Sequence, residues 1–151
     1  MNHPTGTVDE RLQAMVEALR GHGLKVTQQR TEIIREIIHT TDHPDVDTVH
    51  RRVRERIPAV SLDTVYRTMS ALFERGLINR IMADSGRARY DGDVSRHNHF
   101  VCDTCELIID IESSDRGGCR ASDRLSDVGV VERVEVLFRG KCKHCGAEPE
   151  R

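Results

Sequence analysis

Two Cys-x-x-Cys pairs constrain the fold of this 151-residue chain more than any other feature. Cys102 and Cys105 form the first pair, and Cys142 and Cys145 form the second, near the C-terminus. This spacing lets both sulfurs of a tight turn reach one ion, and four thiolates from two such turns complete a closed, tetrahedral zinc shell. Four unrelated thiols or a redox pair are the alternatives, but neither explains the matched spacing. The sequence therefore predicts a structural zinc site, with Cys119 outside it.

A second group of metal ligands precedes the first cysteine pair. His97 and His99 stand two residues apart in an extended apolar stretch, so a strand would point both imidazoles to the same face. Taken alone, they could equally be surface residues. Carboxylates on the flanking segments, Asp91 and Asp110, and His43 in a turn favour a site with nitrogen and oxygen ligands that can exchange its ion. The other histidines are expected to be ordinary surface residues: His3, His22, His39, His50 and His144.

Composition narrows the class of protein further. The chain is long enough for one domain or two small ones, and small domains gain from a metal staple. Only 3% of residues are aromatic, which argues against a large aromatic-lined substrate pocket. No apolar stretch of membrane-spanning length and no export signal stand out, and reduced thiols suit the cytoplasm, so we expect a soluble cytoplasmic protein.

Positive charge gathers in one part of a chain whose formal net charge is -2. Between Val49 and Arg80 there are seven arginines and three acidic residues. Such a patch can bind phosphates, although a solvated helical face gives the same pattern.

Apolar residues at helical spacing predict four helices in the first half of the chain. They cover Val8 to Leu19, a second helix capped by Thr27, a third that begins near Asp45 or Asp47 and is stopped by Pro58, and a fourth with Ser61 as N-cap that ends at Gly76. The last two are joined by a very short turn, which is typical of a helix-turn-helix. Two extended runs around Asp84-Ser85-Gly86 then predict a hairpin, the wing of a winged helix.

The second half of the chain predicts a small sheet. Residues 92–95 are small and polar and indicate a hinge. The histidine strand and the apolar segment from Leu107 to Ile111 suggest a hairpin. The segment from Ser113 to Val128 only weakly suggests a helix, and alternating residues from Val130 to Phe138 predict a strand that leads to the second cysteine pair.

Several of these motifs, in this order, resemble the ferric uptake regulator family over nearly the whole chain. They are Leu24 to Arg30, His43-Pro44, Asp63 to Arg67, His97 to Cys102 and both cysteine pairs. The resemblance implies an α+β fold, with a winged helix-turn-helix DNA-binding domain in residues 1–91, a hinge in 92–95, and a small α/β dimerisation domain with the four-cysteine zinc site in 96–151.

The family resemblance also implies the functional residues and partners. It gives a metal-dependent repressor, a homodimer that binds a double-stranded DNA operator, with no membrane and no small-molecule substrate. The implied regulatory site for Fe(II) or Mn(II) consists of His43, Asp91, His97, His99 and Asp110. The implied DNA contacts are Arg30, Ser61, Thr64, Tyr66 and Arg67.

Asp110 bears on the signal that such a repressor would sense. Iron-sensing members of the family usually carry Glu there, whereas peroxide-sensing members carry Asp, so the resemblance favours a peroxide-responsive repressor. An iron- or zinc-level sensor is the alternative within the family. A metalloenzyme is the rival from another class, but five protein ligands leave little room for substrate, and no nucleophile or phosphate loop accompanies them. A bare zinc-stapled interaction module would not need the winged helix.

Overall fold

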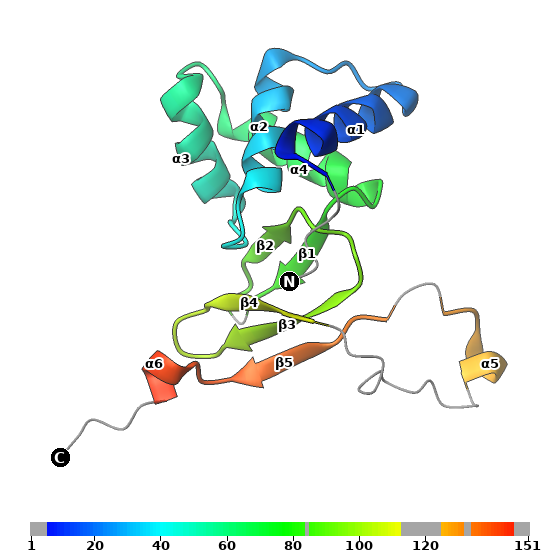
Figure 1. The fold of residues 1–151 in the computed structure, drawn as a ribbon, viewed down its shortest axis with the longest axis vertical. Helices are drawn as coiled ribbons and strands as arrows, with labels where there is room; N and C mark the ends of the chain where they lie inside the picture. The colour runs from blue at the N-terminus through cyan, green and yellow to red at the C-terminus, as the bar shows by residue number, and fades with distance from the viewer. Residues whose placement is uncertain (1–5, 84, 113–124, 132–133, 147–151) are drawn as a thin grey trace. The chain divides into compact units, whose positions relative to one another are not determined.

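Four helices and a two-stranded hairpin form the first of two units into which the chain divides, Asn2–Ser95 and Arg96–Arg151. The computed structural model describes residues 6–83, 85–112, 125–131 and 134–146. The elements of the first unit are α1 (Val8–Gly21), α2 (Gln28–His39), α3 (Val46–Arg56), α4 (Leu62–Glu74), β1 (Asn79–Met82) and β2 (Ala88–Asp91) (Figure 1).

Each helix of this unit begins at a residue whose side chain accepts a backbone N–H of the first turn. Thr27, Asp45 and Ser61 accept from the N–H three residues ahead, as the sequence predicts for α2, α3 and α4. Thr7 forms a full capping box with Glu10 at the start of α1. The helix boundaries therefore follow from local chemistry before any packing is considered.

The core of the unit lies where the four helices meet. The two isoleucine pairs of α2 lie one turn apart and are almost fully buried, because a four-residue spacing keeps them on one face of the helix. The other buried members of this core are Leu12, Leu19, Val49, Val53, Val60, Val65, Met69, Leu72, Ile78 and Tyr90.

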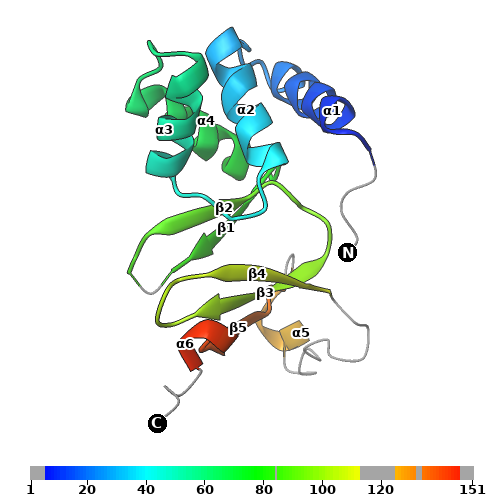
Figure 2. The same ribbon diagram turned by 60° about the vertical axis from the view of Figure 1, so that its left-hand side comes forward.

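The arrangement of α3, α4 and the hairpin is that of a winged helix. The His50 ring makes a hydrogen bond with the Val60 carbonyl, 3.1 Å away, and so holds the short connection between α3 and α4. β1 and β2 pair antiparallel, with Asn79 opposite Asp91. Their turn closes through Gly86, whose φ of 77° favours glycine. Figure 2 shows this hairpin at one end of the helical cluster.

The second unit contains a three-stranded sheet in the order β4-β3-β5. β3 (His97–Cys102) pairs antiparallel with β4 (Ile108–Glu112) and parallel with β5 (Leu137–Gly140). Among its described residues this unit also has two four-residue helices, α5 (Leu125–Val128) and α6 (Lys143–Gly146). An α+β fold with the helices first and this sheet second confirms the expected fold class.

The strand predicted from Val130 to Phe138 is wrong over most of its length. Pairing with β3 begins only at Leu137, opposite His99, and the described residues between Val130 and Val136 belong to no strand. Val130 is 92% exposed and Val134 57%, so the alternation there buries no face. Most of the helix suggested between 113 and 128 lies outside the described residues, and α5 is the part that is described.

Candidate metal centres and nucleic-acid interface

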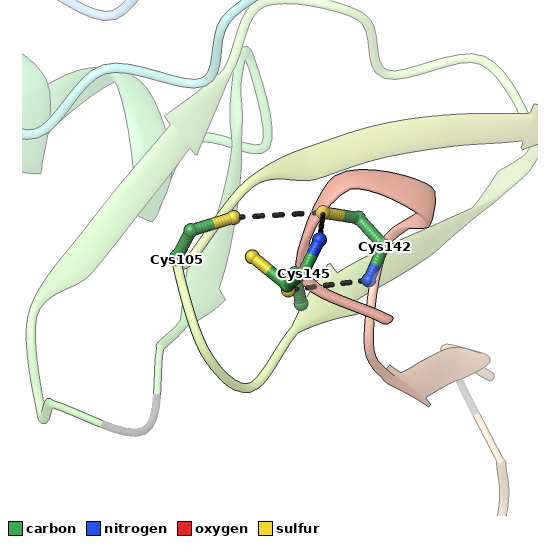
Figure 3. A group of neighbouring side chains, drawn as sticks. Cys105, Cys142 and Cys145 are labelled. Carbon is green, nitrogen blue, oxygen red and sulfur yellow. Dashed lines mark hydrogen bonds between the residues drawn. The ribbon is translucent and has the colours of Figure 1, made fainter. Parts of the chain in front are cut away.

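The four cysteines of the two Cys-x-x-Cys pairs come together at one end of the sheet. Cys102 ends β3 and lies opposite Gly140 of β5 in the parallel register, so the turn after β3 and the turn after β5 are neighbours. All four Sγ atoms lie within 4.8 Å of one another, and those of Cys105 and Cys142 are 3.8 Å apart (Figure 3). Four sulfurs about 2.3 Å from a central zinc lie roughly 3.8 Å from each other in a tetrahedron. The cluster therefore fits a closed zinc site.

Backbone N–H groups of this cluster donate to cysteine sulfurs and so favour the thiolate form that binds metal. Cys142 N–H donates to the Cys102 sulfur at 3.3 Å, and Cys145 N–H donates to the Cys142 sulfur at 3.4 Å. Donation from the Cys142 and Cys105 backbones lowers the pKa of Cys102 to about 6. The Cys105 and Cys142 thiols raise the pKa of Cys145 to about 12. One thiolate forms easily and the next resists ionisation, so a divalent cation is the group that stabilises all four.

His97, His99 and Asp110 converge within the same unit. The two histidines alternate along β3 and share a face, and Asp110 of β4 lies opposite His99 in the antiparallel register. The two Nε2 atoms are 2.9 Å apart, and the Asp110 Oδ1 atom lies 3.6 Å from one and 3.5 Å from the other. Two imidazole nitrogens and a carboxylate oxygen directed at one point are suited to a divalent transition metal such as Fe(II), Mn(II) or Zn(II).

The remaining two predicted ligands, His43 and Asp91, meet in the other unit. His43 has φ 51°, an uncommon conformation for a residue other than glycine, in the turn between α2 and α3. A His43 ring nitrogen and an Asp91 carboxylate oxygen lie within 4.8 Å of each other. The structure thus brings the five sequence-predicted ligands into two groups, one in each unit.

The His43 turn is fixed by the strand that carries Asp91. Arg89 of β2 donates through Nε to the His43 carbonyl and through Nη2 to the Asp42 carbonyl, and Tyr90 N–H donates to the Pro44 carbonyl at 3.0 Å. On the other side, Arg52 of α3 binds the Asp42 carboxylate and lowers its pKa to about 2. These contacts hold an unfavourable backbone conformation at the position that presents the imidazole.

Asp91 is fixed by contacts that follow it in the chain. Its Oδ1 atom accepts Asp93 N–H at 2.8 Å, and the intervening Gly92 lies directly against the last turn of α2. Arg11 of α1 donates to the carbonyl of Gly92 at 3.0 Å and to that of Ile38 at 3.3 Å. Sequence reasoning missed Arg11, Arg89 and the packing of Gly92, because partners 27 to 81 residues away leave no local signal.

The exposed face of α4 is the candidate nucleic-acid interface. Tyr66 is 60% exposed, and the Arg67 side chain forms an ion pair with Asp63. Ser61 and Thr64 are engaged with each other at the helix start, where the Ser61 hydroxyl accepts Thr64 N–H at 3.1 Å. Arg30 lies on α2 and donates to the Lys25 carbonyl at 2.5 Å.

The basic patch is smaller than the sequence indicates. Arg52 and Arg56, two of the four arginines of α3, form ion pairs with Glu36, and Arg56 also pairs with Glu32. α2 therefore neutralises half of the positive face of α3. The positive charge of α4 comes from Arg67. This side chain should therefore contribute more to any contact with phosphates or bases than a larger basic patch would require.

In the described part of the chain, the helices are too short and too polar for any of them to cross a membrane.

Comparison with known proteins gives consistent matches over most of the chain. The family model described as the ferric uptake regulator family matches residues 21–134. Ferric uptake regulation protein 2 of Mycolicibacterium fortuitum is 32% identical over 138 residues, which are 89% of this chain and 94% of that protein. The peroxide-responsive repressor PerR of Staphylococcus epidermidis is 25% identical and covers 94% of this chain and 95% of its own.

Solved structures with a similar fold include a peroxide stress regulator and a ferric uptake regulator. The Campylobacter jejuni peroxide stress regulator has a TM-score of 0.67 at 27% identity, over 86% of this chain and 98% of that one. The Helicobacter pylori ferric uptake regulator, a structure described with three functional metal-binding sites, has a TM-score of 0.76 over 96% and 97% of the two chains. At 19% identity, this second likeness shows the fold alone.

Proposed function

This chain belongs to the ferric uptake regulator family of metal-responsive transcription regulators, and we propose that it is a homodimeric, metal-dependent repressor that binds a double-stranded DNA operator. We assign DNA binding to residues 1–91, a hinge to 92–95, and metal-dependent dimerisation to 96–151. One observation carries the proposal: His43 and Asp91 meet in the winged-helix unit, while His97, His99 and Asp110 converge in the sheet unit.

Metal-dependent control of DNA binding follows if one ion is bound by ligands of both groups, the one in the winged-helix unit and the one in the sheet unit. Neither group alone fills the coordination shell of Fe(II) or Mn(II), so an ion gains ligands when the two units adjoin. It then binds the adjoined arrangement better than any other and shifts the population toward it. To change the ratio of adjoined to other arrangements from 1:99 to 99:1, the ion must bind the adjoined arrangement more tightly by about 5.5 kcal/mol of binding free energy. In a dimer, this arrangement would set the spacing of the two recognition helices on successive major grooves.

We propose a hinge that is shorter than residues 92–95. Gly92 is packed on α2 and bound by Arg11, and the Asp93 carbonyl accepts the Asn79 side-chain amide at 2.8 Å. Both residues thus belong to the rigid part of the winged-helix unit. Val94 is 53% exposed and is followed by Ser95, whose N–H donates to Asp93. We infer that the units pivot between Val94 and Arg96.

The four-cysteine cluster would hold Zn(II) as a structural ion. It joins the ends of β3 and β5, two strands separated by more than thirty residues of sequence, part of which lies outside the described residues. A small sheet buries little apolar surface, so metal binding would supply much of its folding free energy.

The sheet unit also exposes apolar side chains that suit dimerisation. Ile109 and Ile111 of β4 are 44% and 38% exposed, and Phe138 of β5 is 46% exposed. Apolar residues in such numbers on one small sheet are typical of a protein–protein interface. We propose that a second copy of the chain covers them, which size-exclusion chromatography with light scattering would test.

We propose peroxide as the signal. Bound ferrous iron would activate peroxide for a net two-electron oxidation of an imidazole, in which one peroxide oxygen is inserted into a ring C–H bond and the other leaves as water. The imidazole carbons of His43 and His97 are the oxidisable atoms closest to the donor nitrogens, and an imidazole that has gained oxygen would hold metal poorly. The two units would then lose the ion that couples them, and the protein would leave DNA. The similarity to peroxide-responsive repressors over almost the whole chain supports this proposal, as does Asp110 through the family resemblance.

A sensor of iron or zinc level is the second candidate. The 32% identity to ferric uptake regulation protein 2 exceeds the 25% identity to the peroxide-responsive repressor of S. epidermidis, and this favours a response to metal concentration alone. Both candidates share the DNA-binding and metal-binding roles. We assign no enzymatic activity to either, because the relatives that match over most of the chain are regulators of transcription.

One experiment separates the two candidates. Protein loaded with Fe(II) or Mn(II) is bound to operator DNA, treated with low peroxide, and digested for mass spectrometry. Peroxide sensing predicts release from DNA and a gain of about 16 mass units, one oxygen atom, on the peptide with His43 or His97, for Fe(II) only. If the Fe(II) protein remains unmodified and bound, yet releases DNA when the metal is withdrawn, then the metal-level sensor is the correct reading.

A further inference from the structure

The first two turns of α4 expose two charged residues of opposite sign on one face. Asp63 and Arg67 are four residues apart, with side chains 70% and 74% exposed. The Asp63 Oδ2 atom lies 2.9 Å from the Arg67 Nε atom. Exposed pairs at this spacing contribute little to folding stability, because solvent screens the attraction and both side chains lose rotamer freedom. The pairing itself therefore adds little to stability, beyond what Asp63 contributes as a carboxylate in the first turn of a helix.

Asp63 places a negative charge on the helix to which DNA binding is assigned. It lies in the first turn of α4, where the partial positive charge of the helix end would otherwise attract a phosphate. A carboxylate there repels phosphate oxygens and lowers affinity for DNA of any sequence. Asp63 is compatible with DNA binding only if this end of the helix faces base edges, where hydrogen-bond donors such as amino groups are available to a carboxylate.

The geometry of the ion pair matches one base in particular. Asp63 engages the Nε side of the Arg67 guanidinium. Within the part of the chain that the structure describes, neither Nη atom of Arg67 has a hydrogen-bond partner. The two Nη atoms form the end of the planar fork that donates to O6 and N7 of guanine in the major groove. The second oxygen of Asp63 can in turn accept from the N4 amino group of cytosine.

We propose that Asp63 determines specificity, by orienting Arg67 to read the guanine of a G·C base pair in each operator half-site. The proposal rests on the DNA-binding role assigned to this unit and adds a named base and a residue that acts through Arg67. Asp63 limits the rotamers of the Arg67 side chain before DNA binds. Its negative charge lowers the affinity for sites that have no guanine to accept hydrogen bonds from Arg67. Its removal should thus weaken discrimination more than affinity.

The test measures base preference with the full, zinc-containing, Mn(II)-loaded protein. An operator is recovered from a random duplex pool, and each position is then substituted in turn in a binding titration. A bidentate arginine contact is worth about 1 to 3 kcal/mol, so one G·C position should show a preference of roughly 5- to 150-fold. Asp63→Ala should reduce this preference to less than about threefold, while sites with another base at that position bind as well as before or better.

Three further proteins make the result specific to the pair. Arg67→Ala should abolish the same preference at the same position, and the double variant Asp63→Ala/Arg67→Ala should lose no more than Arg67→Ala alone. Asp47→Ala removes an exposed carboxylate from the first turn of α3 and is the matched control for charge. It should change affinity uniformly and leave the preference intact.

Two results would overturn the inference, and they differ in what they imply. If Asp63→Ala keeps the full preference, or if the preference lost differs from the one lost in Arg67→Ala, then Asp63 does not act through Arg67, although the repressor function stands. If the Mn(II)-loaded wild-type protein selects no sequence at all, then the proposed function fails and this inference fails with it. All variants should retain wild-type zinc content, since both side chains are exposed.

Discussion

Gly92 offers a direct test of how the metal-ligand strand is held against the helices, through the substitution Gly92→Ala. A Cβ atom on Gly92 would lie 2.4 Å from the Ile37 carbonyl oxygen, 3.1 Å from its carbon and 3.2 Å from Ile38 Cα. All three are backbone atoms of α2, which cannot rotate away as a side chain would. β2 and the end of α2 must therefore separate.

The size of the effect follows from this contact. Overpacking by a single group typically costs about 1 to 3 kcal/mol, and a rigid backbone neighbour favours the upper half of that range. Separation would also lengthen the bonds from Arg11 to the Ile38 and Gly92 carbonyls. For a unit of this size, each kcal/mol lowers the melting temperature by about 4 to 8 °C, so we expect a decrease of roughly 8 to 24 °C.

Thermal unfolding of the full zinc-containing protein, followed by circular dichroism at a helical wavelength, measures this change. Gly21→Ala is the matched control, because no heavy atom lies within 4 Å of a Cβ built there and its φ is not positive. It ends α1, where alanine favours the helix, so its melting temperature should be unchanged or slightly higher. Equal melting temperatures for the two variants would refute the packing argument.

Three further predictions concern the metal centres and the turn between α2 and α3. Cys142→Ser should release one zinc per chain, measured by elemental analysis, and dissociate the dimer; retention of both would contradict the four-cysteine assignment. Arg89→Met should weaken Mn(II) binding about tenfold or more in a calorimetric titration, because the His43 turn loses two hydrogen bonds. The zinc content should not change. Unchanged Mn(II) affinity would show that the turn keeps its conformation without Arg89. Arg52 lowers the pKa of Asp42 to about 2 from 3.8, so the stabilisation is present above pH 4 and is lost as the pH falls toward 2. Since Asp42 is half exposed, Asp42→Asn should cost less than about 1 kcal/mol at pH 6 and clearly less than that at pH 2 in urea unfolding, and an equal cost at both values would contradict this.

The features that could be predicted from sequence are those set by neighbouring residues. The caps Thr27, Asp45 and Ser61 and the four-residue spacing of the α2 isoleucines decide the helices locally. The cysteine cluster was predictable for the same reason, since each pair fits one turn and only one assembly of the two pairs closes a shell.

The features that sequence reasoning missed depend on contacts between distant segments. Gly92 appears in the sequence as part of a flexible linker, but it is packed on Ile37, 55 residues earlier. The ion pairs of Arg52 and Arg56 with acids of α2 reduce a basic patch that composition alone overstates. The alternation from Val130 to Val136 is real, but a strand also needs a partner edge, and β3 provides one only from Leu137 onward.

Asp63 differs from these cases, because the signal was visible. An acid four residues before Arg67 on a helix predicts an ion pair from sequence alone. What the sequence did not supply is the exposure of both side chains, which leaves the ion pair little role in stability and makes it available to DNA.

In the proposed function, an ion held by nitrogen and oxygen ligands controls sequence-specific DNA binding. The most direct measurement is selection from a random pool of duplex DNA by the zinc-containing protein, with and without Mn(II). We expect an inverted repeat to be enriched only with Mn(II), and we expect this enrichment to be lost when His99→Ala replaces the wild type. Recovery of the same repeat without Mn(II), or by the His99→Ala protein, would contradict it.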